Sequence, residues 1–169
     1  MRNWAKRIGP VGLSKDVAVA VQRQLTCTAE DVFAVLADGW LYPLWVVGAS
    51  RIRAVDPGWP AVGAKLHHSA GVWPLLVNDD TEVLSNEPPH SMVLQARGWP
   101  AGEATVEITV DSGPTGCVVR IEEDATRGPA LLIPKQVRQS AIELRNRESL
   151  RRLAYLAEGR AARRSSDAP

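Results

Sequence analysis

The chain has 169 residues, of which 45% are hydrophobic and 23% are charged, and its formal net charge at pH 7 is +1. This length fits one domain with one sizeable core, and the near-zero net charge argues against nucleic acid or an anionic membrane as a partner of the whole surface. The two cysteines, Cys27 and Cys117, lack metal-ligand spacing, so we predict buried free thiols, no metal site and no cofactor.

The N-terminal region carries the basic residues Arg2, Lys6 and Arg7, but no apolar stretch follows them. We therefore expect no signal peptide. No segment reaches the length of a membrane-spanning helix, so we also expect no integral membrane association. The resulting prediction is a cytoplasmic protein.

Residues 1–15 show no clear hydrophobic period, and we expect them to form an N-terminal extension before a single domain at 16–159. Residues 17–25 alternate branched and smaller or polar side chains, which predicts a strand. Thr28 and Asp31 have the spacing of a capping box and predict a helix that ends at Gly39. A second short helix is expected over 40–45.

The middle of the chain alternates short apolar runs with Gly- and Pro-rich turns, which predicts six more strands. We place them at 50–55, 63–70, 75–86, 91–98, 103–111 and 117–125. Short connections between successive strands indicate an antiparallel meander. Together with 17–25, the sheet should have seven strands, curved and covered on one face.

The last element is a predicted helix from Pro134 to Gly159. Two different apolar stripes run along it, one through Val137, Ala141 and Leu144 and another that begins near Ile142. One stripe is enough for a surface helix. The second stripe therefore indicates that one part of the helix packs against strands while another part roofs a cavity. Residues 160–169 are basic and small, and we expect a disordered tail.

This order of elements resembles the START-like, helix-grip superfamily, also called SRPBCC. The segments that carry the resemblance are 28–40 (TAEDVFAVLADGW), 42–45, 79–94 (DDTEVLSNEPPHSMVL), 103–110 (EATVEITV), 118–123 (VVRIEE) and 146–158 (NRESLRRLAYLAE). The resemblance covers roughly 17–158. It implies an α+β helix-grip fold, in which the curved seven-stranded antiparallel sheet wraps around the long C-terminal helix, with two short helices after the first strand. Many bacterial members are described as polyketide cyclase/dehydrase or lipid-transport proteins, so the resemblance implies a cavity more than a reaction.

Aromatic residues are the first ligand-binding candidates, since six of the nine are Trp. Trp40, Tyr42 and Trp45 fall on the two short helices, which the resemblance places near a cavity mouth, although they could equally plug the core. Trp73 and Trp99 each precede a proline in a turn, where they could cover a cavity or anchor the turn.

Polar candidates for the cavity come from strand parity. Glu123 shares the inward face of its strand, and a carboxylate there needs a partner, for which Arg97 is the candidate. His67 and His68 must point to opposite faces, and we name His67 as the candidate that polarises a ligand carbonyl or exchanges a proton. A structural role for the inward histidine remains open. Asn146 on the long helix is expected to bond ligand or backbone, and Leu144 to line the roof.

Three functions follow, in decreasing order of preference. The first is a carrier or sensor of a hydrophobic small molecule, such as a lipid or polyketide. The second is an enzyme of the cyclase/aromatase type that works in the same cavity by positioning and acid–base help. The third is an interaction protein that uses the basic C-terminal helix. We predict a monomer or homodimer without a nucleic-acid partner.

Overall fold

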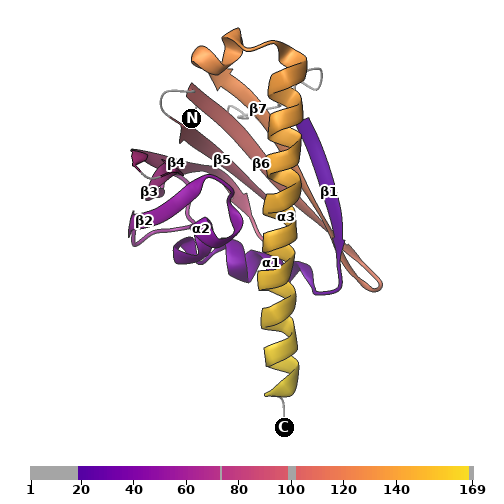
Figure 1. The fold of residues 1–169 in the computed structure, drawn as a ribbon. Helices are drawn as coiled ribbons and strands as arrows, with labels where there is room; N and C mark the ends of the chain where they lie inside the picture. The colour runs from indigo at the N-terminus through magenta and orange to yellow at the C-terminus, as the bar shows by residue number, and fades with distance from the viewer. Residues whose placement is uncertain (1–18, 73, 99–101, 168–169) are drawn as a thin grey trace, which may run out of the picture.

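A computed structural model of the chain describes residues 19–72, 74–98 and 102–167. Seven antiparallel strands form one sheet in the order β1-β7-β6-β5-β4-β3-β2 (Figure 1). They are β1 (Val19–Leu25), β2 (Ala49–Val55), β3 (Lys65–Val72), β4 (Leu75–Glu87), β5 (Ser91–Gly98), β6 (Gly102–Gly113) and β7 (Gly116–Arg127). The order confirms the predicted meander and shows that the first strand closes beside the last.

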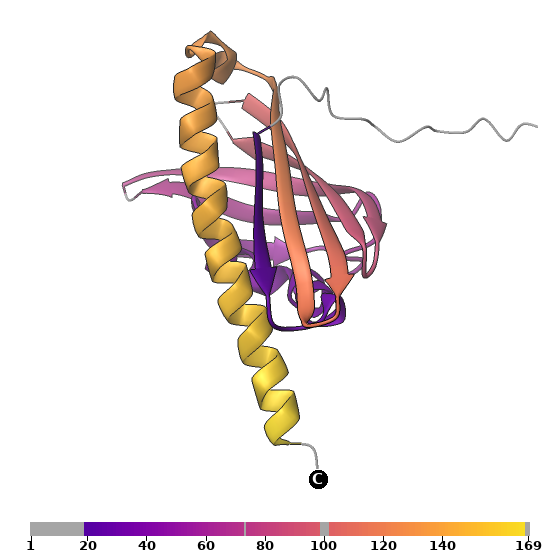
Figure 2. The same ribbon diagram turned by 90° about the vertical axis from the view of Figure 1, so that its right-hand side faces the viewer.

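The helices lie on one face of this sheet (Figure 1). They are α1 (Ala29–Leu36), the 3₁₀ turn η1 (Gly39–Leu41), α2 (Tyr42–Trp45), the 3₁₀ turn η2 (Pro129–Leu132) and α3 (Lys135–Ser166). The helix α3 runs along the sheet, and its C-terminal turns extend beyond the sheet's edge (Figure 2). The predicted helix-grip arrangement is therefore confirmed. No helix within the described ranges combines the length and apolar character needed to cross a bilayer.

Helix α1 begins as its sequence predicts. The Thr28 side chain accepts from the Asp31 amide, and the Asp31 carboxylate accepts from the Thr28 amide, which completes the capping box. The prediction that Gly39 ends this helix is wrong, because α1 ends at Leu36. Gly39 instead begins η1, where a Cβ would lie 2.5 Å from Leu66 Cδ2. Close packing against β3 is therefore what requires a glycine there.

Helix α3 passes through Gly159 and continues to Ser166, so the prediction of an end at Gly159 and of a disordered tail from residue 160 is wrong for 160–166. A single glycine inside a helix costs only about 1 kcal/mol. An ion pair near the C-terminal end of α3 offsets this cost of Gly159. Arg164 Nη1 lies 2.7 Å from Oδ1 of the buried Asp31 on α1.

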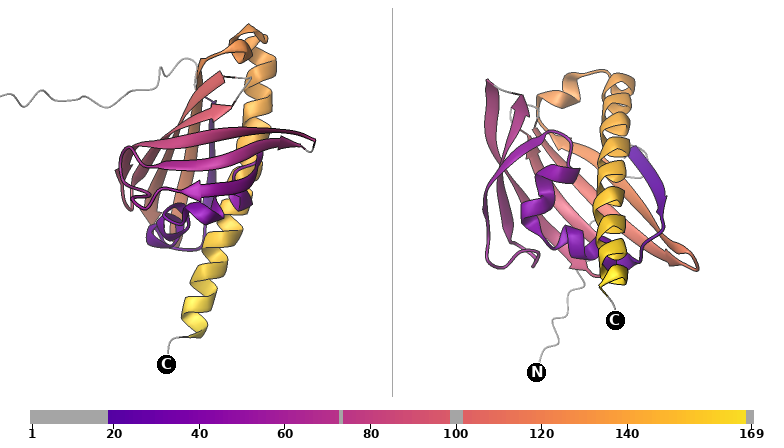
Figure 3. Two further views of the ribbon diagram at one scale, coloured as in Figure 1. Left: turned by 90° about the vertical axis from the view of Figure 1, so that its left-hand side faces the viewer. Right: turned by 60° about the horizontal axis from the view of Figure 1, so that its bottom comes forward.

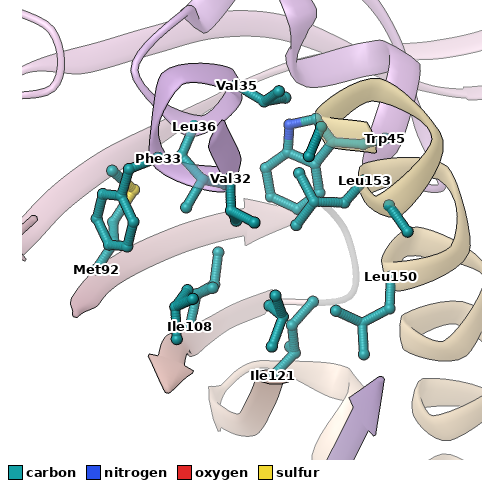
Figure 4. Close-up of a cluster of buried hydrophobic side chains, with 14 of the residues drawn as sticks. Val32, Phe33, Val35, Leu36, Trp45, Met92, Ile108, Ile121, Leu150 and Leu153 are labelled. Carbon is teal, nitrogen blue, oxygen red and sulfur yellow. The ribbon is translucent and has the colours of Figure 1, made fainter. Parts of the chain in front are cut away.

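The core lies between α1, α2, the second half of α3 and the inner face of the sheet. Figure 4 shows Val32 and Leu36 of α1 beside Trp45, with Leu150 and Leu153 of α3 packed toward them. Cys27 and Cys117 are both free and buried at the edge of this core, as predicted. The core fills the space between the sheet and the later turns of α3. The space beside the first turns of α3 is left for a site.

Candidate functional site

Two adjoining cavities lie beside the first half of α3. One, of about 270 Å³, is enclosed by α3 and the ends of β5, β6 and β7. The other, of about 700 Å³, lies between the α2–β2 connection and the hairpin of β3 and β4. Both cavities use Ala96, Arg97 and Arg145 as wall residues, so they meet at these three side chains. We treat them as one site with two compartments.

The walls of the smaller compartment are mostly apolar. The sheet, α3 and the connection before α3 contribute small or branched side chains, namely Ala96, Ala104, Ala125, Ile133, Val137, Ala141 and Ile142. Small residues on facing elements leave a gap because their side chains are too short to meet. This is the physical origin of the hollow, and it favours an apolar occupant.

Glu123 is the buried charge of this compartment, with 4% of its surface exposed. Asn146 Nδ2 donates a hydrogen bond of 2.9 Å to Glu123 Oε2, and Arg145 Nη2 forms an ion pair with the same oxygen. Arg145 and Asn146 are consecutive on α3, so one carboxylate of β7 ties two neighbouring helix positions to the sheet. The inward position predicted for Glu123 is confirmed by its burial.

Arg97 is not the partner of Glu123, so that expectation is wrong. Its Nη1 lies 3.0 Å from Asp80 Oδ2, and its Nε lies 3.5 Å from Glu103 Oε1. Both partners are neighbours of Arg97 across the sheet: Glu103 pairs with it directly in the β5–β6 register, and Asp80 lies on the adjacent strand β4. Arg97 thus lines both compartments while its charge is balanced on the sheet.

A second polar group lies on the wall of the larger compartment. The imidazole of His68 and the phenol of Tyr42 both contact the hydroxyl of Thr81. His68 Nε2 and Tyr42 OH are each 3.1 Å from Thr81 Oγ1. The rings of Tyr42 and His68 lie 5.4 Å apart. His68 is only 4% exposed, and its Nδ1 has no hydrogen-bond partner among the described residues.

Burial sets the charge states of Tyr42 and His68. It raises the pKa of the Tyr42 phenol, although the hydrogen bond with Thr81 opposes the shift. It lowers the pKa of His68, against the attraction of the nearby Asp79 carboxylate. Both rings are therefore neutral at pH 7. A neutral imidazole has one donor and one acceptor nitrogen, so His68 Nδ1 is left to serve a ligand hydroxyl or carbonyl, according to tautomer.

The prediction that His67 faces the cavity is wrong, because the adjacent His68 is the histidine that lines it. His67 is on the outer face of β3, and its Nε2 lies 3.4 Å from Asp56 Oδ1. Strand parity contains the missing signal, because Ala64, Leu66 and His68 share the buried face.

The three aromatic residues predicted to lie together, Trp40, Tyr42 and Trp45, have different surroundings. Tyr42 and Trp45 are buried, with ring centroids 5.5 Å apart, and Trp45 packs in the core. Trp40 is 61% exposed and lines a separate surface hollow beside Trp59. It lies outside the two compartments because the 3₁₀ turn η1 directs it away from the core. The candidates Trp73 and Trp99 lie outside the described residues.

Leu144 is 70% exposed, which corrects the expectation that it lines the roof. Ala141, Ile142 and Arg145 line the cavity, whereas Leu144 turns to the solvent side of α3. Its predicted stripe partners Val137 and Ala141 do line the smaller compartment.

Comparison with known proteins places this chain in a family. A sequence model described as "Polyketide cyclase / dehydrase and lipid transport" matches residues 16–158. The chain belongs to this family. A search of the curated proteins finds no match to it.

Solved structures similar to this family member share its fold. Protein MLL2253 from Mesorhizobium loti is 24% identical, with a TM-score of 0.63, over 83% of this chain and 96% of that one. Protein NE0264 from Nitrosomonas europaea is 12% identical, with a TM-score of 0.68, over 88% and 99%. The di-domain ARO/CYC StfQ of the steffimycin biosynthetic pathway is 13% identical, with a TM-score of 0.67, over 88% of this chain and 53% of that one.

Three residues of the site in this family member were missed by sequence reasoning: His68, Thr81 and Arg145. Thr81 shares strand parity with the buried Val83, which is a readable signal. Arg145 is one of many arginines on α3, and its contact with Glu123, 22 positions earlier, is visible only once the helix is docked. Within the described ranges, no three His, Cys, Asp or Glu side chains gather closely enough to hold a metal ion.

Proposed function

We propose that the chain binds a small, largely apolar molecule that carries a hydroxyl or carbonyl group, in the two-compartment cavity beside α3. The observation that carries the proposal is His68, a buried side chain on the cavity wall whose Nδ1 is unpartnered among the described residues. Burying a polar nitrogen without a partner is unfavourable, so such an atom points to a ligand group that completes the hydrogen bond.

The two polar clusters have different roles in this proposal. Glu123, Arg145 and Asn146 satisfy one another and hold α3 at a fixed distance from β7. His68, supported by Thr81 and Tyr42, orients the ligand. Affinity comes from apolar contact with the walls, at roughly 25 cal/mol for each Å² buried.

Native mass spectrometry of the purified chain tests the proposal, because a bound molecule should appear as a discrete added mass. An apolar fluorescent probe, 8-anilinonaphthalene-1-sulfonate, tests the cavity directly. We expect His68→Phe, which fills space and removes Nδ1, to weaken probe binding, and the outward control His67→Phe to leave it unchanged. Absence of any added mass, together with equal probe binding by the two variants, would contradict the proposal.

A cyclase-like enzyme is the second candidate, and the same histidine favours it. A neutral imidazole held by the Thr81 hydroxyl, which also contacts the Tyr42 phenol, can accept a proton from a ligand or return one. We place it second because one imidazole nitrogen supplies only one proton-transfer group. Incubating the copurified molecule with the protein and following its turnover separates the two functions, since His68→Gln should abolish turnover in an enzyme.

Three further expectations concern the location of the protein and its partners. Cytoplasmic location, a monomeric or homodimeric state and the lack of a nucleic-acid partner stay predictions from the sequence. Size-exclusion chromatography with light scattering tests the oligomeric state.

A further inference from the structure

The connection between β7 and α3 exposes an unusual run of apolar side chains. Leu132 is 87% exposed, and Leu131 and Ile133 on either side of it are exposed as well. Val137 in the first turn of α3 is also exposed. Contiguous exposed apolar residues on a protein surface mark a contact with a protein partner, a membrane or a ligand.

This run lies at the mouth of the smaller compartment. Ile133 and Val137 belong both to the exposed run and to the cavity wall. The connection is the orange turn at the top of Figure 1, at the opposite end from α1. The side view in the left panel of Figure 3 places it at the extremity of the molecule, where a flat surface can reach it.

The charged residues of the chain segment that carries the run have one sign. From residue 127 to 142 the chain contains Arg127, Lys135 and Arg138 and no acidic residue. Nearby acids lie on the strands, where Glu103 contacts Arg97 and pairs in register with Arg127. Within residues 127–142 the cations are therefore in excess, although the whole chain carries a net charge of only +1.

We propose that this connection docks the protein on an anionic lipid bilayer. Leu131, Leu132 and Ile133 enter the boundary between head groups and acyl chains, while the cations stay at the level of the lipid phosphates. Long basic side chains suit this border because their stems are apolar and their charged ends reach the phosphates.

A second copy of the chain fits this surface less well. A two-fold dimer brings the same patch of both copies together. The three cations of one copy would then face those of the other, without acids in this segment to separate them. An anionic bilayer instead matches both the apolar run and the surrounding charge.

Docking here presents the open side of the smaller compartment to the membrane. A ligand then passes between bilayer and cavity without crossing water. This last step rests on the proposed function, whereas docking itself does not.

Sedimentation of the full chain with vesicles tests the proposal. We compare phosphatidylcholine vesicles with vesicles that contain about one-third phosphatidylserine, because each basic residue near an anionic surface contributes about fivefold in affinity at low salt. We expect binding to be at least about tenfold stronger on the anionic vesicles and to weaken with added salt.

Leu132→Asp should reduce vesicle binding by about tenfold or more, since a carboxylate enters the interface poorly and is repelled by it. The control is Leu44→Asp on α2, which is 54% exposed and lies outside this region. It should bind as the unmodified chain does. Lys135→Gln should reduce binding by about fivefold. Circular dichroism checks that each variant is folded.

Equal binding to neutral and anionic vesicles would overturn the proposal, as would equal loss in the two Asp variants. A chain that ignores vesicles but forms a dimer dissociated by Leu132→Asp would overturn it in favour of self-association. Failure of the cavity proposal is separable, because His68→Phe should lose probe binding and still sediment with anionic vesicles.

Discussion

The two halves of α3 lie against the same sheet but have opposite surroundings. In the second half, Leu153, Ala154 and Ala157 are buried against α1 and the strands. In the first half, Ala141 and Arg145 line a cavity. One continuous helix thus closes the core at one end and bounds a hollow at the other.

Side-chain size and polarity along the helix explain this difference. Leucine at successive inward positions reaches across to the facing strands and fills the space between them. Alanine cannot reach, and arginine does so only through its charged end, which is held by Glu123. The packed half should therefore carry most of the stability, and the open half most of the ligand specificity.

The largest expected effect tests the packed half. Leu153→Ala removes a fully buried side chain and should lower the free energy of unfolding by about 2–5 kcal/mol. Leu144→Ala, on the exposed side of the same helix, should change it by less than about 0.5 kcal/mol. Urea denaturation measures both, and equal losses would show that the two positions are not packed differently.

The next effect tests the link between β7 of the sheet and α3. Glu123→Gln leaves a neutral acceptor for Arg145 and Asn146, so the free energy of unfolding should fall by about 1–2 kcal/mol. The loss is moderate because the Arg145 side chain is 41% exposed, and water can solvate its charge.

The neighbouring Glu122 supplies the control for that measurement. It contacts Arg120 on the outer face, with 2.6 Å between Arg120 Nε and Glu122 Oε1. An exposed pair of this kind contributes less than about 1 kcal/mol, so Glu122→Gln should be nearly neutral. A larger loss for Glu122→Gln than for Glu123→Gln would refute the assignment of Glu123 as the tie between β7 and α3.

Acid should weaken the fold through His68. Burial lowers the pKa of His68 in the folded state below the unfolded value of about 6.5, although Asp79 opposes the shift and Arg53 adds to it. Above about pH 7 the imidazole is neutral in both states. As the pH falls below 6.5, the unfolded state takes up the proton first, so the free energy of unfolding falls by at most about 1.4 kcal/mol per pH unit.

Urea denaturation at a series of pH values measures this slope. His68→Gln should flatten it, whereas the outward control His67→Gln should retain it. Identical slopes in the two variants would mean that His68 is not held neutral by burial.

The smallest effect tests the far end of the packed half. Arg164→Gln removes the ion pair with the buried Asp31 and should cost up to about 1 kcal/mol, because the arginine end is exposed. Asp31 keeps its hydrogen bonds with Thr28. Helix content from far-ultraviolet circular dichroism shows whether residues 160–166 stay helical without the pair.

The strands and the start of α1 could be read from the sequence because both depend on local pattern. Alternation defines a strand over a few residues, and a capping box needs only Thr28 and Asp31. The inward position of Glu123 followed from the same alternation.

The partners of the site residues could not be read in this way. Glu123 binds Arg145 and not Arg97 because the docking of α3 decides the pairing, and docking depends on the packing of distant leucines. The end of α3 was also misjudged, since the contact that extends it past Gly159 joins residues 133 positions apart. The inward position of His68 could be predicted from the sequence, because His68 lies two residues after Leu66 and therefore on the same buried face of β3.

The two ends of α3 are also anchored unequally along its own backbone. Pro134 at the start provides no side-chain cap, and the first turn holds no acidic residue to meet the positive end of the helix dipole. Backbone amides near residue 138 should therefore exchange with deuterium much faster than those near Leu153. Fraying of these first turns would widen the mouth of the smaller compartment while the packed half stays folded, so ligand exchange would proceed at the rate at which the helix end opens.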